Sequence, residues 1–354
     1  MNRLDRARIK LREIGLNAVI ITDELNIRYI TGFEVSDAMV LLTTSTAHLL
    51  TDFRYYEMAL NALSSDFEVI SGGSRAEYIK DVLAKEGISS LGFEGMAVTY
   101  EDYLKYKGIF APASLEDVKD LFFSLRIKKD SDEIEKTQKA QDIADAAFST
   151  LLDVIKPDMT EIEVAAELEY IMRKLGSEGP AFSTIAVSGD ASALPHGVPR
   201  AVKLKPGFLT LDFGAKYMGY CSDMTRTIVI GKADDDMKKL YNTVLRAQLA
   251  AIDYLRLGRD AFMADKVARD IINENYEGAF GHSLGHGVGL LVHEGPNLSP
   301  RSAGVILDAG NIVTVEPGIY LFGKYGCRIE DMIAINEDGI HNFTHSTKEL
   351  IELF

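Results

Sequence analysis

Four carboxylates in the second half of the chain stand within or at the ends of short apolar runs. They are Asp212, Asp223, Glu316 and Glu330. An acidic group among apolar strand residues is costly to bury unless it is paired or bound to a metal. Any one of them alone could be an ion-paired or exposed strand residue. Four in one domain, together with several histidine-bearing loops, favour a fold that brings them to a single site.

Asp212 and Asp223 are separated by a short segment that can reverse direction. Asp212 ends one apolar run, Asp223 opens the next, and Gly214 and Gly219 lie between them. Glycine adopts turn conformations that other residues avoid. We therefore expect the two aspartates to face each other across a hairpin.

Histidines are concentrated in the same part of the chain. Of seven, four lie within a hundred residues in loops that contain glycine or proline: His196, His282, His286 and His293. A lone histidine is usually structural. Four close together favour a functional role, because binding residues are often carried by loops on a rigid scaffold.

The spacing of these residues excludes most short metal motifs, since there is no HExxH helix, CxxC pair or EF-hand loop. Four carboxylates and one imidazole suit Mn²⁺, Co²⁺, Fe²⁺ or Zn²⁺. Without cations, clustered carboxylates repel one another and raise one another's pKa. Two divalent ions would balance the four negative charges. The side chains therefore predict a two-metal site and leave these four ions open, of which we expect Mn²⁺ first.

The chain has 354 residues, which suggests two domains. Short β-rich runs alternate with helical patterns in the first part, as in an α/β layer. A charged stretch at 126–132 marks the boundary, which we set at residues 122 and 123. From residue 180, strand-like runs alternate with Gly/Pro turns around helices expected near 235–255 and 262–275. This pattern of strands and turns with separate helices predicts an α+β second domain rather than a doubly wound sheet.

Two helix starts can be predicted between these parts. Ser131 is placed to cap a helix that runs to about residue 155, where Pro157 ends it. Thr160 and Glu163 form a capping-box pattern that opens the next helix.

Overall charge excludes some partners. There are 38 Lys+Arg against 53 Asp+Glu, a formal net charge of −15. Attraction to nucleic acid or an anionic membrane is therefore not expected. Two cysteines cannot form a disulfide framework, and no apolar run approaches the length of a membrane span or signal-peptide core. We expect a cytoplasmic protein.

The motifs around these residues resemble a known family. The sequences LDFG, CSDMTRT, GHSLGHGVG, VEPGIY and RIEDM resemble the segments that hold the five metal ligands of the pita-bread metallopeptidases. SALPHG around His196 and GLLVHEGP around His293 are similar to the Xaa-Pro aminopeptidase and prolidase branch. The resemblance covers the whole chain. It implies a creatinase-like α/β domain at 1–122 and an α+β pita-bread catalytic domain at 123–354.

The resemblance also implies how the ligands are shared. Asp223, His286 and Glu316 would hold one ion, Asp212 and Asp223 the other, and Glu330 would bridge the two. Matching positions make these five residues the expected metal set.

Catalytic roles follow from the same resemblance. Glu316 would accept and return the proton of the attacking water. His196, His282 and His293 would orient substrate, stabilise the oxyanion and help protonate the leaving imino nitrogen. Arg328 lies two residues before Glu330, on the same strand face, and could orient a ligand carboxylate. Its alternative role is a surface charge pair.

The expected activity is release of the residue before proline, as in an Xaa-Pro aminopeptidase. The alternative is a prolidase acting on Xaa-Pro dipeptides, which the motifs do not separate. Two further alternatives are a non-catalytic peptide-binding module and, as in creatinase, an enzyme that cleaves a non-peptide C–N bond. Ser183, Ala191 and Leu291 depart from common family residues and bear on substrate preference. The resemblance also implies a homodimer formed through the amino-terminal domain.

Overall fold

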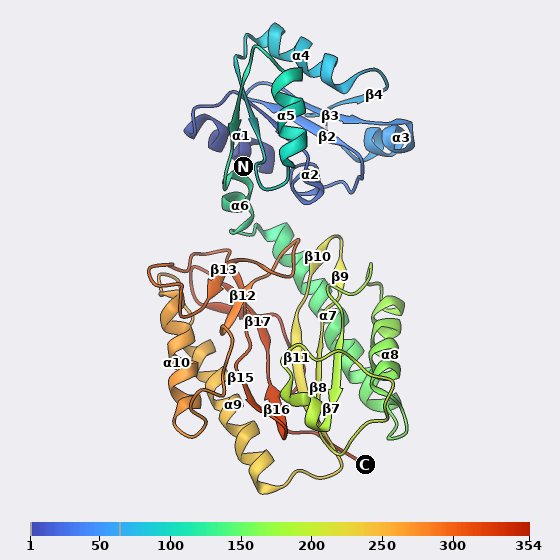
Figure 1. Cartoon of the computed structure of the whole chain (residues 1–354), viewed down its shortest axis with the longest axis vertical. Helices are drawn as coiled ribbons and strands as arrows, with labels where there is room; N and C mark the ends of the chain where they lie inside the picture. The colour runs from blue at the N-terminus through green and yellow to red at the C-terminus, as the bar shows by residue number, and fades with distance from the viewer. Residues whose placement is uncertain (1, 64) are drawn as a thin grey trace. The chain divides into compact units, whose positions relative to one another are not determined.

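The computed structural model describes residues 2–63 and 65–354, and the chain divides into two compact units, Met1–Arg126 and Ile127–Phe354 (Figure 1). The boundary expected at residue 122 lies inside the short helix α6 (Leu121–Arg126), and the first unit ends where this helix ends. Among the described residues, no helix combines the length and apolar character needed to cross a membrane.

The first unit is built on one mixed sheet with the strand order β4-β3-β2-β1-β5-β6. Its strands are β1 (Ala18–Ile21), β2 (Met39–Thr43), β3 (Ala47–Thr51), β4 (Glu68–Ser71), β5 (Ser90–Phe93) and β6 (Ser114–Asp117). Its other helices are α1 (Arg3–Glu13), α2 (Glu24–Thr31), α3 (Phe53–Ala62), α4 (Arg75–Glu86) and α5 (Tyr100–Ile109). All four residues of β1 are buried, which is why this strand is continuously apolar instead of alternating.

The second unit contains two larger sheets and two small hairpins. The four-stranded sheet has the order β19-β11-β8-β7, and the five-stranded sheet has the order β13-β12-β14-β17-β18. The strands of the first are β7 (Ile185–Ser188), β8 (Gly207–Phe213), β11 (Met224–Ile230) and β19 (Glu352–Leu353). Those of the second are β12 (Gly285–Gly287), β13 (Glu294–Leu298), β14 (Ile312–Val315), β17 (Asp331–Ile335) and β18 (Ile340–Asn342). The hairpins are β9 (Lys216–Tyr217) with β10 (Tyr220–Cys221) and β15 (Gly318–Leu321) with β16 (Tyr325–Arg328).

A pair of helices covers each sheet, as Figure 1 shows. Helices α7 (Ser131–Val154) and α8 (Glu161–Lys174) share a core with β8 and β11, in which Phe148 and Leu168 pack with Leu211. Helices α9 (Asp235–Tyr254) and α10 (Ala261–Asn273) share another core with β14 and β17, through residues such as Val244 and Val313. The predicted α+β arrangement is thus present, and its helices α9 and α10 start within a residue of the expected positions.

Helix capping agrees with the sequence in one case and differs in the other. Thr160 caps α8 and Glu163 completes the predicted capping box. For α7 the expected cap was wrong by one residue, because Asp130 occupies the N-cap and Glu133 closes the box. Aspartate and serine are similarly good caps, so the choice depends on which residue has extended backbone.

Candidate active site

One cavity in the second unit, of about 350 Å³, is lined by every residue that the sequence predicts for the site. Those nine residues are His196, Asp212, Asp223, His282, His286, His293, Glu316, Arg328 and Glu330. They come from strands and loops separated by more than a hundred positions in the sequence. The two sheets therefore bring the four carboxylates to one common location, as expected from the sequence.

Asp212 and Asp223 lie at the same end of a long antiparallel pair. β8 and β11 pair along their whole length, and Asp212 stands opposite Thr225. A Cβ added to Gly214 would lie 1.8 Å from the carbonyl oxygen of Ser222, so only glycine allows this close approach. The predicted hairpin arrangement is confirmed, with β9 and β10 inserted at its tip.

His286 is held on β12 by glycine on both sides. Added Cβ atoms on Gly285 and Gly287 would each lie 2.0 Å from a carbonyl oxygen, of Thr314 and Gly295 respectively. The Nδ1 atom of His286 lies 3.1 Å from the carbonyl oxygen of Gly287. A carbonyl can only accept a hydrogen bond, so Nδ1 carries the hydrogen and Nε2 faces the carboxylates.

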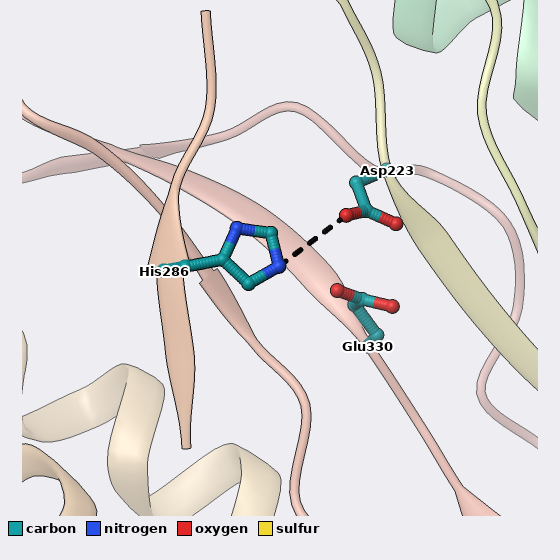
Figure 2. A group of neighbouring side chains, drawn as sticks. All are labelled: Asp223, His286 and Glu330. Carbon is teal, nitrogen blue, oxygen red and sulfur yellow. Dashed lines mark ion pairs between the residues drawn. The ribbon is translucent and has the colours of Figure 1, made fainter. Parts of the chain in front are cut away.

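Asp223, His286 and Glu330 converge most closely. One ligand atom from each lies within 4.8 Å of the others, and Figure 2 shows the three side chains reaching toward a common space. Nε2 of His286 is 3.6 Å from Asp223 Oδ2 and 3.3 Å from Glu316 Oε1. Asp223 and Glu330 are only 4% and 1% exposed, so water screens their charges poorly.

The carboxylates repel one another in this setting. Burial, followed by the charges of Glu330, Asp212 and Glu316, raises the pKa of Asp223 well above its ordinary value. Burial and the charges of Glu316 and Asp212 do the same for the pKa of Glu330. Burial also raises the pKa of Asp212, although Arg328 opposes this shift.

These carboxylates fit divalent cations. Oδ1 of Asp212 is buried and has no hydrogen-bond partner among the described residues. A buried anionic oxygen without a partner is unfavourable unless a cation contacts it. Three crowded carboxylates with raised pKa values and an available imidazole nitrogen give the same indication.

His286 and Glu316 have opposite pKa shifts from one pairing. Burial lowers the pKa of His286, but its hydrogen bond and attraction to Glu316 outweigh burial and leave the pKa raised. Burial raises the pKa of Glu316, but His286 outweighs it and lowers the pKa to about 2. The attraction between His286 and Glu316 is thus strong enough to outweigh the burial of both side chains.

Arg328 is a buried partner of this carboxylate group. Its side chain is 3% exposed, and Nη2 lies 2.6 Å from Asp212 Oδ2. Its Nε donates to the hydroxyl of Thr225 at 3.0 Å. The alternative of a surface charge pair is wrong, because the packed strands enclose the guanidinium and direct it at Asp212.

Comparison with known proteins agrees with this geometry. The profile of metallopeptidase family M24 matches residues 135–337, and that of the creatinase/prolidase N-terminal domain matches residues 3–128. The chain belongs to metallopeptidase family M24. An Xaa-Pro dipeptidase of Pyrococcus horikoshii is 39% identical over 341 residues, which cover 95% of each chain.

Solved structures of similar proteins share the whole architecture with this M24 peptidase. An Xaa-Pro dipeptidase from Bacillus anthracis is 41% identical with a TM-score of 0.94, covering 99% of each chain. An X-Pro aminopeptidase from Thermotoga maritima is 36% identical with a TM-score of 0.92, covering 98% of this chain and all of that one. The expected fold is confirmed: a creatinase-like domain precedes a pita-bread domain. The expectation of a hydrolytic metalloenzyme that uses divalent ions is confirmed as well.

Two residues of the M24 site were not predicted from the sequence, although both stand in motifs that resemble the family: Tyr320 in VEPGIY and Thr225 in CSDMTRT. The hydroxyl of Tyr320 accepts a hydrogen bond from Arg328 Nη1 at 2.7 Å and lies 2.9 Å from His282 Nε2. The hydroxyl of Thr225 donates to Glu330 Oε2 at 2.7 Å. Strand alternation could have indicated Thr225, since residues two apart share a face.

The carbonyl oxygen of Ser283 determines the tautomer of His282, and Tyr320 binds the other ring nitrogen. Nδ1 of His282 lies 2.8 Å from the carbonyl oxygen of Ser283 and therefore carries a hydrogen. Burial lowers the pKa of His282, which favours the neutral ring. In that ring Nε2 accepts the hydroxyl hydrogen of Tyr320.

The remaining wall of the M24 cavity combines histidine with apolar side chains. The rings of His293 and His286 have centroids 4.2 Å apart, and burial lowers the pKa of His293. Phe182, Ile185 and Pro195 form the apolar part of the lining. The cavity thus offers polar groups for a peptide backbone and an apolar surface for its side chains.

Proposed function

We propose that this M24 peptidase is an Xaa-Pro dipeptidase that hydrolyses the bond before a carboxyl-terminal proline. The observation that carries the proposal is the single cavity in which four carboxylates and His286 converge. Two similar proteins at 39% and 41% identity are named Xaa-Pro dipeptidases, whereas the X-Pro aminopeptidase is 36% identical. These relatives favour the dipeptidase alternative over the aminopeptidase that the motifs first suggested, which becomes the second candidate.

We propose two divalent ions per chain, Mn²⁺ first, with Co²⁺, Fe²⁺ or Zn²⁺ as alternatives. Asp223, His286 and Glu316 would hold one ion, Asp212 and Asp223 the other, and Glu330 both. The buried, unpaired oxygen of Asp212 supports this assignment. When bound, such ions lower the pKa of water and polarise the scissile carbonyl group.

The chain's own residues would then handle protons and substrate. Glu316 would accept a proton from the attacking water. The nitrogen of proline carries no hydrogen in the peptide and must gain a proton when the bond breaks. Glu316 would return the proton of the water to this nitrogen. His282, whose ring orientation is fixed by Tyr320 and Ser283, would help to place the nitrogen for that transfer. His196 and His293 would orient the substrate carbonyl and stabilise its developing charge.

Arg328 would position a metal ligand, and the apolar lining of the cavity would position the substrate. Arg328 would hold Asp212 in the orientation that an ion requires, since its other donors are occupied by Thr225, Tyr320 and Pro195. Phe182, Ile185 and Pro195 would contact the apolar parts of the dipeptide.

A substrate-length series tests the proposal. The purified enzyme is assayed with an Xaa-Pro dipeptide, the tripeptide that extends it by one residue, and a longer peptide. We expect kcat/KM for the dipeptide to exceed that for the tripeptide by about tenfold or more, because discrimination of this size is normal for one added group. Faster cleavage of the longer peptides would favour the aminopeptidase. Tight binding without product would favour a peptide-binding module.

Metal removal tests the proposed centre. Chelation should abolish turnover, and Mn²⁺ or Co²⁺ should restore it, with two ions per chain found by elemental analysis. His286→Ala should bind less metal and lose activity while its circular dichroism spectrum remains that of the folded protein. Turnover that is indifferent to chelation would contradict the metal centre.

We also propose a cytoplasmic homodimer. Two cysteines, which are too few for a disulfide framework, support the compartment, and resemblance to the family supports the dimer. Light scattering should then give about twice the chain mass of 39.0 kDa.

A further inference from the structure

The segment that carries His282 is rich in glycine, and its backbone is hydrogen-bonded to side chains of the neighbouring helix α10. Residues 278–289 contain five glycines, which lose more conformational freedom on folding than other residues. We call residues 280–284 the histidine loop. An ion pair of α10, formed by Asp265 and Arg269, binds this loop and does not line the cavity.

The two charged residues form a forked pair one helical turn apart. Nε and Nη2 of Arg269 lie 2.7 Å and 2.8 Å from the two carboxylate oxygens of Asp265. Asp265 is 1% exposed, so the pair is largely shielded from water. A bidentate pair of this kind has a fixed geometry as well as attraction.

The pair directs its remaining hydrogen bonds to the backbone of the histidine loop. Nη1 of Arg269 donates to the carbonyl oxygen of Phe280 at 2.7 Å, and Nη2 donates to that of His282 at 2.8 Å. Oδ1 of Asp265 accepts from the backbone N–H of Leu284 at 3.0 Å. The guanidinium also lies 4.3 Å from the centroid of the Phe280 ring. Three backbone groups of one five-residue loop are thus bound by one ion pair.

The anchored loop connects directly to the proposed ligands. The carbonyl oxygen of Leu284 accepts a hydrogen bond from the backbone N–H of Glu316 at 2.8 Å. His286 follows two residues later on β12. A shift of the loop would therefore move His282 and disturb the backbone of Glu316.

We propose that Asp265 and Arg269 are positioning residues of the active site. Neither lines the cavity, and both act by fixing the loop from which His282 reaches the substrate. The inference rests on the proposed function for the role of His282. It adds that the geometry of this histidine is set by an ion pair on a neighbouring helix.

The same helix provides a matched control. Lys266 and Asp270 have the same spacing and lie 2.6 Å apart, but their side chains are 46% and 61% exposed. Among the described residues, this pair makes polar contacts only within α10. A general effect of losing an ion pair on α10 should therefore appear at both pairs, and a positioning effect only at the buried one.

Arg269→Lys is the decisive variant. Lysine keeps the charge and can pair with Asp265, but its single nitrogen cannot also donate to two carbonyl groups in a forked arrangement. With an Xaa-Pro dipeptide we expect kcat to fall about tenfold to a hundredfold, with KM changed less than about threefold. Asp265→Asn should have the same direction of effect, and Asp270→Asn should leave both constants unchanged. Arg269→Lys retains both charges, so it keeps the test available if Asp265→Asn does not fold.

Hydrogen exchange of the metal-free, full-length protein provides a readout that does not depend on turnover. In Arg269→Lys the amides of residues 281–284 should exchange about tenfold faster or more, while those of β8 and α9 keep their rates. Uniform acceleration throughout the second unit with unchanged kcat would mean a purely structural role and would overturn the proposal. Wild-type kcat and wild-type exchange would overturn it too. If the wild-type enzyme cleaves no Xaa-Pro peptide, the proposed function fails, and the exchange rates still decide whether the pair anchors the loop.

Discussion

At the scale of single residues, the buried carboxylates of the site lower the stability of the metal-free protein. Asp223 and Glu330 are buried beside other carboxylates, and their pKa values are raised for that reason. A raised carboxyl pKa means that ionisation opposes folding, so the metal-free protein loses stability as the pH rises above the unfolded value. Cations remove this repulsion, which couples metal binding to folding.

Asp223→Asn should therefore affect stability with opposite signs in two conditions. In chelator at pH 8, the substitution should raise the free energy of unfolding by about 1 kcal/mol, because one buried negative charge is removed. In excess Mn²⁺ the substitution should lower the free energy of unfolding relative to wild type, because the variant's folded state binds metal more weakly and is stabilised less by it. Urea unfolding in both buffers measures the difference. An equal decrease in the free energy of unfolding in both buffers would mean that Asp223 stabilises the folded structure and does not bind an ion.

At the scale of elements, close backbone approach decides where His286 lies. β12 is three residues long and lies between β13 and β14. Its two glycines are required by neighbouring carbonyl oxygens and not by turn conformation, since neither has a left-handed φ. The glycine-rich run therefore forms a strand at this point.

Gly285→Ala should displace β12, because the new Cβ would lie 2.0 Å from the carbonyl oxygen of Thr314. We expect a loss of about 3 kcal/mol in the free energy of unfolding, at the upper end for overpacking, and weaker Mn²⁺ binding. Gly281→Ala is the matched control, as its Cβ meets nothing within 4 Å. Chemical denaturation and metal titration of both variants test this. Equal effects of the two substitutions would contradict the steric argument.

Another element is held by a carboxylate at the start of α8. Glu161 is fully buried, and its oxygens accept hydrogen bonds from Ser188 and from the backbone and guanidinium of Arg200. Burial raises the pKa of Glu161, but these donors outweigh burial and leave the pKa lowered. The charged form thus stabilises the folded state, in contrast to Asp223.

The sign of the pH dependence follows for Glu161. Its contribution should be complete above the unfolded pKa, near 4.3, and should be lost as the pH falls through the lower folded pKa. Glu161→Gln should cost about 3 kcal/mol at pH 7, because a buried partner of Arg200 is removed. The difference between wild type and variant should shrink below pH 4. Urea unfolding across this range checks it, and a difference that is constant down to pH 2 would contradict the assigned role.

At the scale of the whole molecule, two units have separate cores. Ile20, Leu41 and Ile79 belong to a core of the first unit, and the cores around Leu211 and Val313 belong to the second. The proposed metal centre draws all its ligands from the second unit. Binding should thus stabilise that unit directly.

We expect the protein to unfold thermally in two stages. Hydrogen exchange of peptides from each unit, measured across the temperature range, monitors the two transitions. Saturating Mn²⁺ should raise the transition of residues 127–354 by several degrees and leave that of residues 1–126 near its metal-free value. His286→Ala should remove the shift and serves as the control. A single transition that moves as a whole would show that the two units unfold together.

Several features were accessible from the sequence because they depend on short windows. The strand runs, the Thr160–Glu163 capping box and the α9 and α10 helices follow from local periodicity and capping chemistry. The capping residue of α7 was misplaced by one position because Asp130 and Ser131 are both good caps. Local chemistry names the residue types at a helix end, and backbone conformation chooses among them.

The sequence by itself determined the chemistry of the site: four carboxylates in apolar runs need partners, and their number calls for about two divalent cations. Only the tertiary structure decided how these groups are oriented. The burial of Arg328 against Asp212, the bridge of Tyr320 to His282 and the anchoring of the histidine loop by Asp265 and Arg269 all join distant positions or different elements. Such contacts depend on strand register and packing, which no short stretch of sequence contains.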